Sequence, residues 1–387
     1  MNIMELENKY IPPIFPKRPV ILQKGKGAKV WDVNGKEYID CVGGNGVALV
    51  GHSHPKLVNA IQKQAEELII CPYVFYNEMR AKLLEKLAKL TPAPLERTFL
   101  SNSGAEAVEA AIKLARKSTG KTDIISMKGG FHGRTFGALS ATWNPKYRNP
   151  FQPLVPGFTH VPFGDMEAAK TAISEDTAAI ITEAVQGEGG VIVAPEGFLQ
   201  DLRELCDTKG ILLIIDEVQT GLGRTGEFLA ANHWKVVPDI LCLAKGIAGG
   251  IPLGATMASS EVFGALKSGE HYSTFGGNPL VCAAANAVLD IIQEENLVAN
   301  SKKMGTYFMD LLKIEIQPLR IVRELRGLGL MLAIDLRLKH KDFIIKAMEQ
   351  GLLLLTSGST TLRMLPSLNI SKHEIDRIIS ILSDILQ

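Results

Sequence analysis

The feature that most constrains the fold of this sequence is an alternation of short apolar segments with helix-like segments from about residue 54 onward. The segments LVNAIQKQAEEL (57–68) and RAKLLEKLAKL (80–90) carry apolar residues at helical spacing. The apolar segments are RTFL (97–100), DIISM (123–127), AAIITEA (178–184), ILLIID (211–216), DILCLA (239–244) and GATMA (254–258). Such segments are typical of strands that helices cover on both faces. The alternation therefore predicts an α/β fold with a largely parallel sheet.

Both ends of the chain lack this alternation. Residues 1 to about 20 are rich in proline, and we expect them to be irregular. The segment VWDVNGKEYID (30–40) indicates two short strands joined at Asn34-Gly35, a dipeptide favoured in tight hairpin turns. After about Leu280 helices and strands are mixed, and an amphipathic helix begins at Lys372.

These changes of pattern predict the domain organisation. A chain of 387 residues can enclose more than one hydrophobic core. We expect residues 51–285 to form a large domain around the mostly parallel sheet. We expect residues 1–50 and 286–387 to form a smaller α+β domain.

The composition argues against several classes of protein. A formal net charge of +1 provides no general attraction to nucleic acid or to a membrane surface. The five cysteines are scattered and form no C-x-x-C pair, which argues against a disulfide framework and a zinc site. The N-terminus lacks the pattern of a signal peptide, and no apolar run approaches the roughly 20 residues of a membrane span. We therefore expect a cytoplasmic protein that binds no metal, nucleic acid or membrane.

Two of the predicted strands end in an ionisable residue. The strand 211–216 ends at Asp216, and the strand 239–244 is followed directly by Lys245 and a glycine-rich turn. Ligands of open α/β sheets bind outside the carboxyl ends of the strands. A lysine at such an edge is usually solvated, but against an apolar wall its amine can become a nucleophile toward carbonyl compounds.

A third segment offers a position for a phosphate group. In SNSGAEAVEAAIKLAR (101–116), Ser103 and Glu106 have the spacing of a capping box at the start of a helix. The N–H groups of Ser103, Gly104 and Ala105 are therefore candidates for binding an anion. Alone, this pattern favours an ordinary helix cap, because such caps are common and the segment matches no nucleotide-binding motif. Together with an acid for a ring nitrogen and an imine-forming lysine, it predicts pyridoxal 5'-phosphate as cofactor.

These residues also carry a resemblance to a known family. The motifs FHGRT, EAVQGEGGV, IIDEVQTGLGRTG, AKGIAGGIPLGA, STFGGNPL and LRMLPSL occur in the order seen in class III (ornithine-type) pyridoxal-phosphate aminotransferases. The resemblance runs from about Lys24 to the C-terminus and implies the type I fold of pyridoxal-phosphate-dependent transferases. Within the class, SNSGAEAVEAA, ATWNPKYRNPFQPLVPGF and GSTTLRMLPSL resemble the acetylornithine group and the related group that acts on an amino-group carrier protein.

The resemblance implies a role for each residue of the cofactor site. Lys245 would bind the cofactor covalently and then transfer a proton as general base and acid, and Asp216 would pair with the pyridine nitrogen. Phe131 and Val218 would contact the two faces of the ring, and Gln219 would approach its phenolic oxygen. The implied cofactor-binding set is Ser103, Gly104, Ala105, Phe131, Asp216, Glu217, Val218, Gln219, Lys245 and Thr274, with Thr274 reaching the phosphate of the second subunit of a homodimer.

The resemblance also implies how two substrates share one pocket. Arg363 would bind the α-carboxylate of glutamate, Arg134 its distal carboxylate, and Ser273 lies beside Thr274 at the substrate side. When the substrate is a terminal amine, Arg363 loses its carboxylate partner, and Glu188 would then neutralise it. Relatives usually have a proline where this chain has Ala184, which puts the geometry of Glu188 in question.

Three histidines near these motifs receive structural interpretations. We interpret His132 as a hydrogen-bonding residue near the cofactor, because Lys245 already accounts for proton transfer. His52 and His54 resemble metal ligands, but no cysteine or pair of acids accompanies them at metal spacing. We therefore place them in a turn near the entrance of the dimer.

The functional hypothesis is an aminotransferase that moves a terminal amino group between an N-blocked ornithine or lysine and 2-oxoglutarate. The blocking group could be acetyl or a small acidic carrier protein, although the chain offers only scattered basic residues for meeting such a protein. Alternatives with the same fold are an ornithine or 4-aminobutyrate aminotransferase, an aminomutase or a decarboxylase. A non-catalytic scaffold is disfavoured by the intact Asp216 and Lys245, and a nicotinamide dehydrogenase by the lack of a G-x-G-x-x-G motif.

Overall fold

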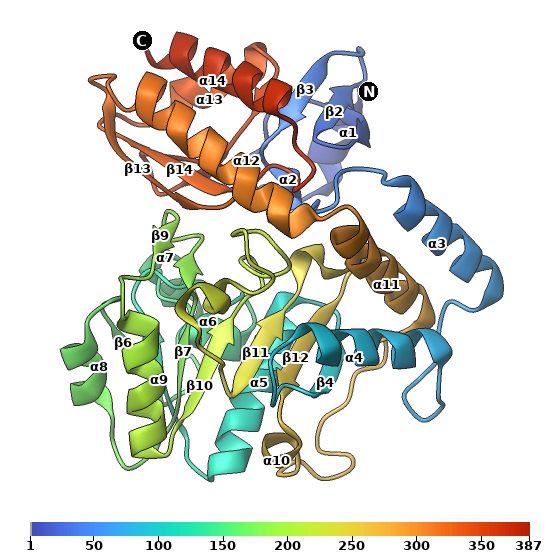
Figure 1. Cartoon of the computed structure of the whole chain (residues 1–387), viewed down its shortest axis with the longest axis vertical. Coiled ribbons are helices and arrows are strands. Elements are labelled where there is room, and N and C mark those ends of the chain that lie inside the picture. Colours follow the sequence, from blue (N-terminus) through green and yellow to red (C-terminus); the bar gives the residue numbers. More distant parts are fainter. Residues whose placement is uncertain (1) are drawn as a thin grey trace.

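The computed structural model describes residues 2–387 and contains one seven-stranded sheet, two four-stranded sheets beside it, and a two-stranded sheet of β8 (Val185–Gln186) and β9 (Ile192–Val193) (Figure 1). The strand order of the large sheet is β4-β12-β11-β10-β7-β5-β6. In the part of the chain that the structure describes, β12 is the one strand of this sheet that runs antiparallel to its neighbours. Its strands are β4 (Arg97–Ser101), β5 (Asp123–Met127), β6 (Phe158–Val161), β7 (Thr177–Thr182), β10 (Leu212–Asp216), β11 (Ile240–Leu243) and β12 (Gly254–Ala258). The predicted α/β fold with a mostly parallel sheet is confirmed.

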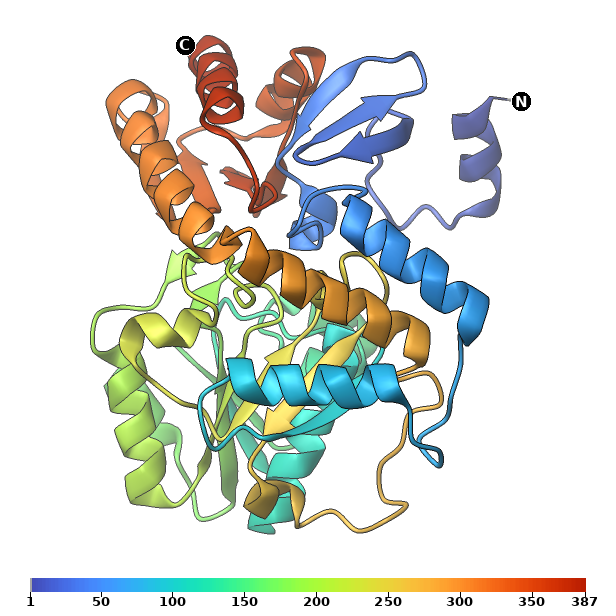
Figure 2. The ribbon, with the colours of Figure 1, turned by 45° about the vertical axis from the view of Figure 1, so that its right-hand side comes forward.

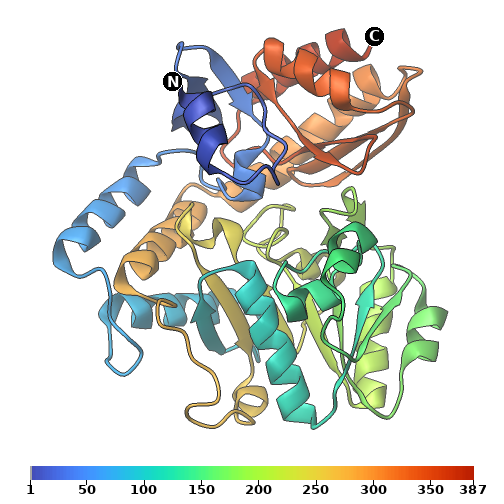
Figure 3. The same cartoon turned by 180° about the vertical axis from the view of Figure 1, so that it is seen from behind.

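Helices cover both faces of the large sheet because its strands are apolar on both sides. In β10, Ile214 packs into a core formed with α5 (Gly104–Thr119), whereas Leu213 and Ile215 pack into a core formed with α9 (Phe198–Lys209). Figure 3 shows α5 lying across the face of the sheet that is turned toward the viewer there. The other helices around this sheet are α3 (Pro55–Glu67), α4 (Glu78–Leu90), α6 (Phe136–Ala141), α7 (Pro145–Arg148), α8 (Met166–Ala172), α10 (Ser260–Phe263) and α11 (Pro279–Glu294).

The two four-stranded sheets bring the ends of the chain together. One sheet has the order β1-β2-β3-β15, in which Leu352 of β15 pairs with Ile39 of β3 in parallel. The other has the order β13-β14-β17-β16. Figure 2 shows the N-terminal strands beside the C-terminal helices, above the large sheet. The elements here are β1 (Leu22–Lys26), β2 (Lys29–Asp32), β3 (Glu37–Asp40), α2 (Gly43–Gly46), α12 (Leu297–Leu311), β13 (Val322–Leu328), β14 (Met331–Leu336), α13 (Lys341–Glu349), β15 (Leu352–Leu353), β16 (Leu355–Ser357), β17 (Thr361–Met364) and α14 (Lys372–Leu386). The boundaries near residues 50 and 286 remain predictions.

The N-terminal segment differs from the expectation of irregular structure. Helix α1 (Ile3–Tyr10) begins with a capping box, in which Asn2 accepts a hydrogen bond from the Glu5 N–H and Glu5 accepts one from Asn2. The helix buries none of its residues, so its caps, rather than packing, are the local reason for it. Across residues 2–387, no helix has the length and apolar character needed to cross a membrane.

Candidate active site

Asp216 and Lys245 lie at the same edge of the large sheet. Asp216 is the last residue of β10, and it pairs in parallel register with Cys242 of the neighbouring strand β11. Lys245 follows two residues after β11 and begins the short helical turn η3 (Lys245–Ala248). Both side chains line one cavity of about 280 Å³. The sheet therefore brings together an acid and an amine that are separated by 29 positions in the sequence.

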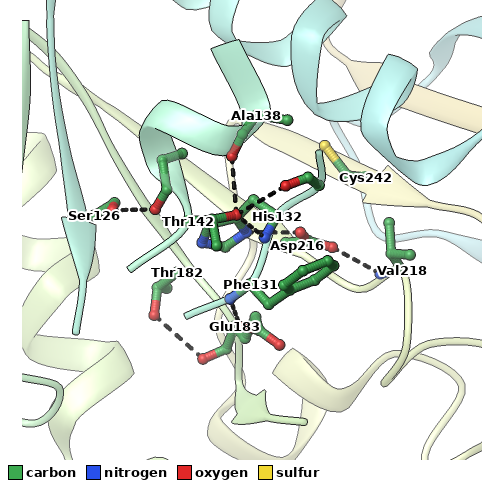
Figure 4. A network of polar contacts seen from close by, with 12 residues as sticks. Ser126, Phe131, His132, Ala138, Thr142, Thr182, Glu183, Asp216, Val218 and Cys242 are labelled. Atoms are coloured by element: carbon green, nitrogen blue, oxygen red, sulfur yellow. Dashed lines mark hydrogen bonds and ion pairs between the residues drawn. The ribbon is translucent and has the colours of Figure 1, made fainter. Parts of the chain in front are cut away.

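Asp216 is buried and has a polar partner for each carboxylate oxygen (Figure 4). Its Oδ1 accepts a hydrogen bond from the N–H of Val218 at 3.0 Å. Its Oδ2 lies 2.8 Å from Nδ1 of His132, as predicted for a histidine with a hydrogen-bonding role. Burial disfavours the charged imidazole, but the hydrogen bond and charge of Asp216 outweigh burial and raise the pKa of His132.

Glu183 is a buried acid beside this pair that the sequence analysis did not identify. It follows β7, so it lies at the same sheet edge as Asp216. Its carboxylate accepts hydrogen bonds from the N–H groups of Phe131 (3.0 Å) and Gly187 (3.3 Å). Burial and the charge of Asp216 raise the pKa of Glu183, although the nearby His132 opposes this. The rule that identified Asp216, an acid at the end of an apolar strand, also applies to Glu183.

Lys245 has an unusual backbone and a perturbed amine. Its φ of 49° lies in the left-handed region, which is costly for a residue with a side chain and is often found at functional sites. Burial lowers the pKa of the Lys245 amine, while the charges of Asp216, Glu188 and Glu183 partly oppose this. A lowered pKa increases the neutral fraction of the amine, which is the nucleophilic form.

The N-terminus of α5 opens onto the cavity through Gly104 and Ala105. The first N–H groups of an α-helix have no partner within the helix, and they lie at the positive end of its dipole. A Cβ on Gly104 would lie 2.7 Å from Cγ1 of Val218, so glycine permits the close approach of these elements. Ser103 caps the helix by accepting from the Glu106 N–H at 3.2 Å. In a capping box Glu106 would also accept a hydrogen bond from the N–H of Ser103. Here Glu106 accepts instead from the N–H of Asn102, one residue earlier, at 2.7 Å.

Phe131, Val218 and Gln219 also line the cavity, whereas Glu217 does not. The Oε1 atom of Gln219 is buried without a hydrogen-bond partner among the described residues. Glu217 instead accepts hydrogen bonds from the N–H groups of Ala230 and Ala231, both at 2.8 Å, at the start of the turn η2 (Ala230–Trp234). The Glu217 carboxylate is therefore occupied at η2, and the place of Glu217 in the cofactor-binding set stays a prediction.

Arg363 and Glu188 form an ion pair at the cavity. Nη2 of Arg363 lies 2.7 Å from Oε1 of Glu188, and the exposed fractions of the two side chains are 3% and 34%. Arg363 comes from β17, and Glu188 follows the short strand β8 (Val185–Gln186). Because Arg363 is buried, this contact is not a surface ion pair. Alanine in place of proline at position 184 is compatible with this pairing.

Arg134 lines the cavity without an acidic partner among residues 2–387. Its guanidinium group lies 3.6 Å from the ring centre of Tyr147 and 5.4 Å from that of Phe131. Contacts with aromatic faces hold such a group in place and leave its N–H donors free for an anion.

Like Glu217, six other predicted residues lie outside the cavity lining: Ser103, Arg363, Ser273, Thr274, His52 and His54. Thr274 is exposed, and Ser273 accepts a hydrogen bond from the side chain of Asn102 at 3.2 Å. His52 pairs with Asp40 at 2.7 Å. His54 caps α3 by accepting from the N–H of Lys56, as expected for a residue in a turn.

The residues of the cavity fit pyridoxal 5'-phosphate. An acid suited to the pyridine nitrogen, an amine suited to the aldehyde carbon and a helix N-terminus suited to the phosphate surround one space. The unpaired Oε1 of Gln219 and the glycine at position 104 are consistent with a polar group and a close backbone approach. The fold and the site together define a pyridoxal-phosphate-dependent enzyme of the type I fold.

Comparison with known families agrees with this class. Residues 14–386 match the family described as Aminotransferase class-III. The chain belongs to this family and is an aminotransferase that depends on pyridoxal phosphate.

Two named relatives differ in their substrates. The chain is 48% identical to the acetylornithine aminotransferase of Methanopyrus kandleri, over 100% of this chain and 99% of that protein. It is 45% identical to the [LysW]-aminoadipate semialdehyde transaminase of Deinococcus radiodurans, over 98% of this chain and 89% of that protein.

A solved structure has the same overall arrangement. The crystal structure of ornithine aminotransferase from Toxoplasma gondii ME49 is 35% identical, with a TM-score of 0.96 over 99% of this chain and 94% of that one.

Proposed function

We propose that this aminotransferase moves the terminal amino group of an N-blocked ornithine or lysine to 2-oxoglutarate, which yields glutamate. The observation that carries this proposal is the ion pair between the buried Arg363 and the partly exposed Glu188. A terminal amine has no carboxylate on the reacting carbon, whereas glutamate does. An enzyme that uses both substrates therefore needs a negatively charged partner for Arg363 when the terminal amine is bound. That partner must move away when glutamate is bound.

The energetics of burial explain why the partner is needed. Removing one member of a buried ion pair is destabilising by about 3–5 kcal/mol, because the remaining charge is left without compensation. With a terminal amine bound, Glu188 neutralises Arg363. With glutamate bound, the α-carboxylate takes the place of Glu188, and the more exposed Glu188 side chain turns toward water. Arg134 then binds the distal carboxylate with its free donors.

The other cavity residues support the chemistry of amino transfer. Pyridoxal phosphate, when bound, supplies the electron-withdrawing ring that stabilises negative charge on the substrate carbon. Asp216 would accept a hydrogen bond from the protonated ring nitrogen, and His132 holds that carboxylate in place. Lys245, as a neutral amine, would take the proton from the substrate carbon and deliver it to the cofactor carbon that carries the nitrogen, and its lowered pKa favours this neutral form. The N-terminus of α5 would bind the phosphate through its free N–H groups.

A second cavity of about 620 Å³ supports a substrate that carries a blocking group. It shares Phe131 and Glu188 with the cavity that Asp216 and Lys245 line, so the two cavities adjoin. Trp143, Asn144 and Tyr147 line it on one side. The names of the relatives in Methanopyrus and Deinococcus agree with an amine that is blocked by an acetyl group or a carrier protein.

Free ornithine is the second candidate for the amine. The similarity to the ornithine aminotransferase structure of Toxoplasma gondii supports it, although the 48% identity to an acetylornithine enzyme is higher than the 35% identity to that structure. Half-reactions distinguish free ornithine from an N-blocked amine as the substrate. Each amine is added alone to the cofactor-loaded enzyme, and the change in cofactor absorbance is followed. We expect N-acetylornithine or a carrier-linked amine to react with a higher kcat/KM than ornithine or 4-aminobutyrate.

Glu188→Ala tests the role of the ion pair. We expect the ratio of kcat/KM for glutamate to that for the terminal amine to rise at least about tenfold, because glutamate no longer competes with Glu188 for Arg363. Glu196→Ala serves as a control, since Glu196 is exposed and has no ion-pair partner in the described chain. An unchanged ratio in Glu188→Ala contradicts the proposal.

We propose that the protein carries out this function as a homodimer. Thr274 is exposed and lies outside its own cavity lining, which suits a contact with the phosphate of a second subunit. Exposed apolar side chains at Val74 and Phe75 suit an interface between subunits. Sedimentation of the cofactor-loaded protein at micromolar concentration checks this, and a monomer with normal cofactor affinity contradicts it.

A further inference from the structure

The loop that carries Glu188, residues 187–191, is a tight turn with a strained backbone, and we refer to it as the switch loop. Within it, Gly187 O accepts hydrogen bonds from the N–H groups of Gly190 (3.2 Å) and Val191 (3.4 Å). Val191 is buried and has a φ of 58°, which is a costly conformation for a β-branched residue. A backbone of this kind persists only where the surrounding structure holds it.

Three side chains of the C-terminal sheet hold the switch loop by its carbonyl oxygens. Nη1 of Arg363 donates to Gly187 O at 2.6 Å. Oγ of Ser357 donates to Glu188 O at 2.6 Å. Nε of Arg326 donates to Gly190 O at 2.9 Å. These donors come from three strands of one sheet, β17, β16 and β13.

The fit of Arg326 against the switch loop depends on glycine. Gly190 has a φ of 109°, and a Cβ at that position would lie 3.2 Å from Nη2 of Arg326. The Nη1 atom of Arg326 pairs with Glu324 at 2.9 Å, which orients the guanidinium group. Arg326 is therefore fixed at both ends, to the strand β13 and to the loop.

Two of the three contacts are independent of the substrate. Arg363 uses the same guanidinium group for Gly187 O and for the Glu188 carboxylate, so it must adjust when a substrate carboxylate replaces Glu188. Ser357 and Arg326 contact only backbone atoms of the loop. They can hold its main chain unchanged while the Glu188 side chain moves away and returns.

We propose that Ser357 and Arg326 are positioning residues that keep the switch loop in one backbone conformation during both half-reactions, so that only the Glu188 side chain moves. This inference rests on the proposed exchange between Glu188 and the α-carboxylate of glutamate. It assigns to the C-terminal sheet a role in selecting between the two substrates. Without these contacts the loop holds Glu188 less firmly against Arg363. The α-carboxylate of glutamate then displaces Glu188 from Arg363 more easily.

The experiment is a double-mutant cycle between the loop contacts and Glu188. Ser357→Ala and Arg326→Ala are each made in the native chain and in Glu188→Ala. The half-reactions with glutamate and with N-acetylornithine provide one readout. Calorimetric titration of the cofactor-loaded enzyme with glutarate, which has two carboxylates and no amine, provides a second readout that involves no turnover.

In the native background, each variant is expected to raise the preference for glutamate about 3- to 10-fold and to tighten glutarate binding by a similar factor, as for the loss of one hydrogen bond. In the Glu188→Ala background, the same substitutions are expected to change neither quantity. Arg323→Ala is the matched control, because Arg323 lies on the same strand and pairs with Asp335 without contacting the loop. Arg326→Lys is the milder variant if Arg326→Ala does not fold.

The outcomes separate this inference from the proposed function. Equal shifts in both backgrounds, or no shift in the native background, overturn the positioning role. If Glu188→Ala changes the preference while Ser357→Ala and both Arg326 variants do not, the proposed function stands and the inference fails. If Glu188→Ala itself leaves the preference unchanged, the exchange at Arg363 fails, and the inference fails with it.

Discussion

Lys245 and Asp216 show how neighbouring strands in a sheet determine the chemistry of individual residues. Each is an ordinary ionisable side chain in the sequence, yet each lies at the edge of a buried strand, where water is scarce. Burial lowers the pKa of Lys245. The hydrogen bond and the charge of Asp216 raise the pKa of the His132 imidazole. The same environment thus favours a neutral amine and a paired carboxylate within one cavity.

Replacement of the lysine tests its proposed role. We expect Lys245→Ala to reduce kcat at least roughly 100-fold, because no other amine among residues 2–387 lines the cavity to transfer the proton. The fold should persist, because the substitution removes a costly buried amine and leaves the strand β11 intact. Steady-state kinetics and circular dichroism provide the measurements, and a normal kcat contradicts the assignment.

Replacement of His132 tests how Asp216 is held. We expect His132→Leu to weaken cofactor binding roughly 10- to 100-fold, since a hydrogen bond to a charged group contributes about 1.5–3 kcal/mol. His132→Asn should restore much of the affinity, because its amide can donate from near the position of Nδ1. Titration of the cofactor-free protein with pyridoxal phosphate measures this. Equal losses in both variants would point to packing alone.

At the scale of elements, helix ends show where local patterns succeed and where they fall short. The spacing of Ser103 and Glu106 correctly predicts the start of α5, although Glu106 bonds to Asn102 rather than to Ser103 N–H. The sequence pattern does not predict the helix α1, because the prolines that follow it indicate irregular structure, whereas the cap formed by Asn2 and Glu5 favours a helix. The hydrogen bonds of a helix cap depend on which of several nearby N–H groups the backbone turns toward the capping side chain.

Gly104 links the helix α5 to the cofactor site. We expect Gly104→Ala to weaken the binding of pyridoxal phosphate, because the new methyl group would lie 2.7 Å from Val218 and displace it or the helix N-terminus. The melting temperature of the cofactor-free protein should change much less than the dissociation constant of the cofactor. Fluorescence titration checks the prediction, and an unchanged affinity contradicts it.

At the scale of the whole molecule, the parallel pairing of β15 with β3 joins segments that are more than 300 residues apart. Arg224, in the loop after β10, adds a second connection, because its Nη1 donates to the carbonyl oxygens of Leu330 and Pro366. The C-terminal sheet is thereby held against the edge of the large sheet. This arrangement places Arg363 within reach of Glu188.

The stability of the folded chain should depend on His160. Burial, together with the charge of Arg148, lowers the pKa of His160 to about 4 from its usual value of 6.5. The unfolded chain therefore binds the proton first, and the free energy of unfolding should fall as the pH drops from about 6.5 toward 4. Urea unfolding across this range measures the slope. We expect His160→Gln to reduce it, and an identical slope would contradict the assignment.

The sequence by itself predicted the mostly parallel sheet, the strand ends at Asp216 and Lys245, and the helix start at Ser103. These features depend on apolar periodicity and on residues that are near one another in the chain. The contacts of Glu183, Ser357 and Arg326 were decided only by the tertiary structure. They join residues of different sheets or strands, and no local pattern specifies which carbonyl a distant donor will meet. The physical reason is that hydrogen-bond partners follow from how whole sheets pack, whereas strand and helix formation follow from neighbouring side chains.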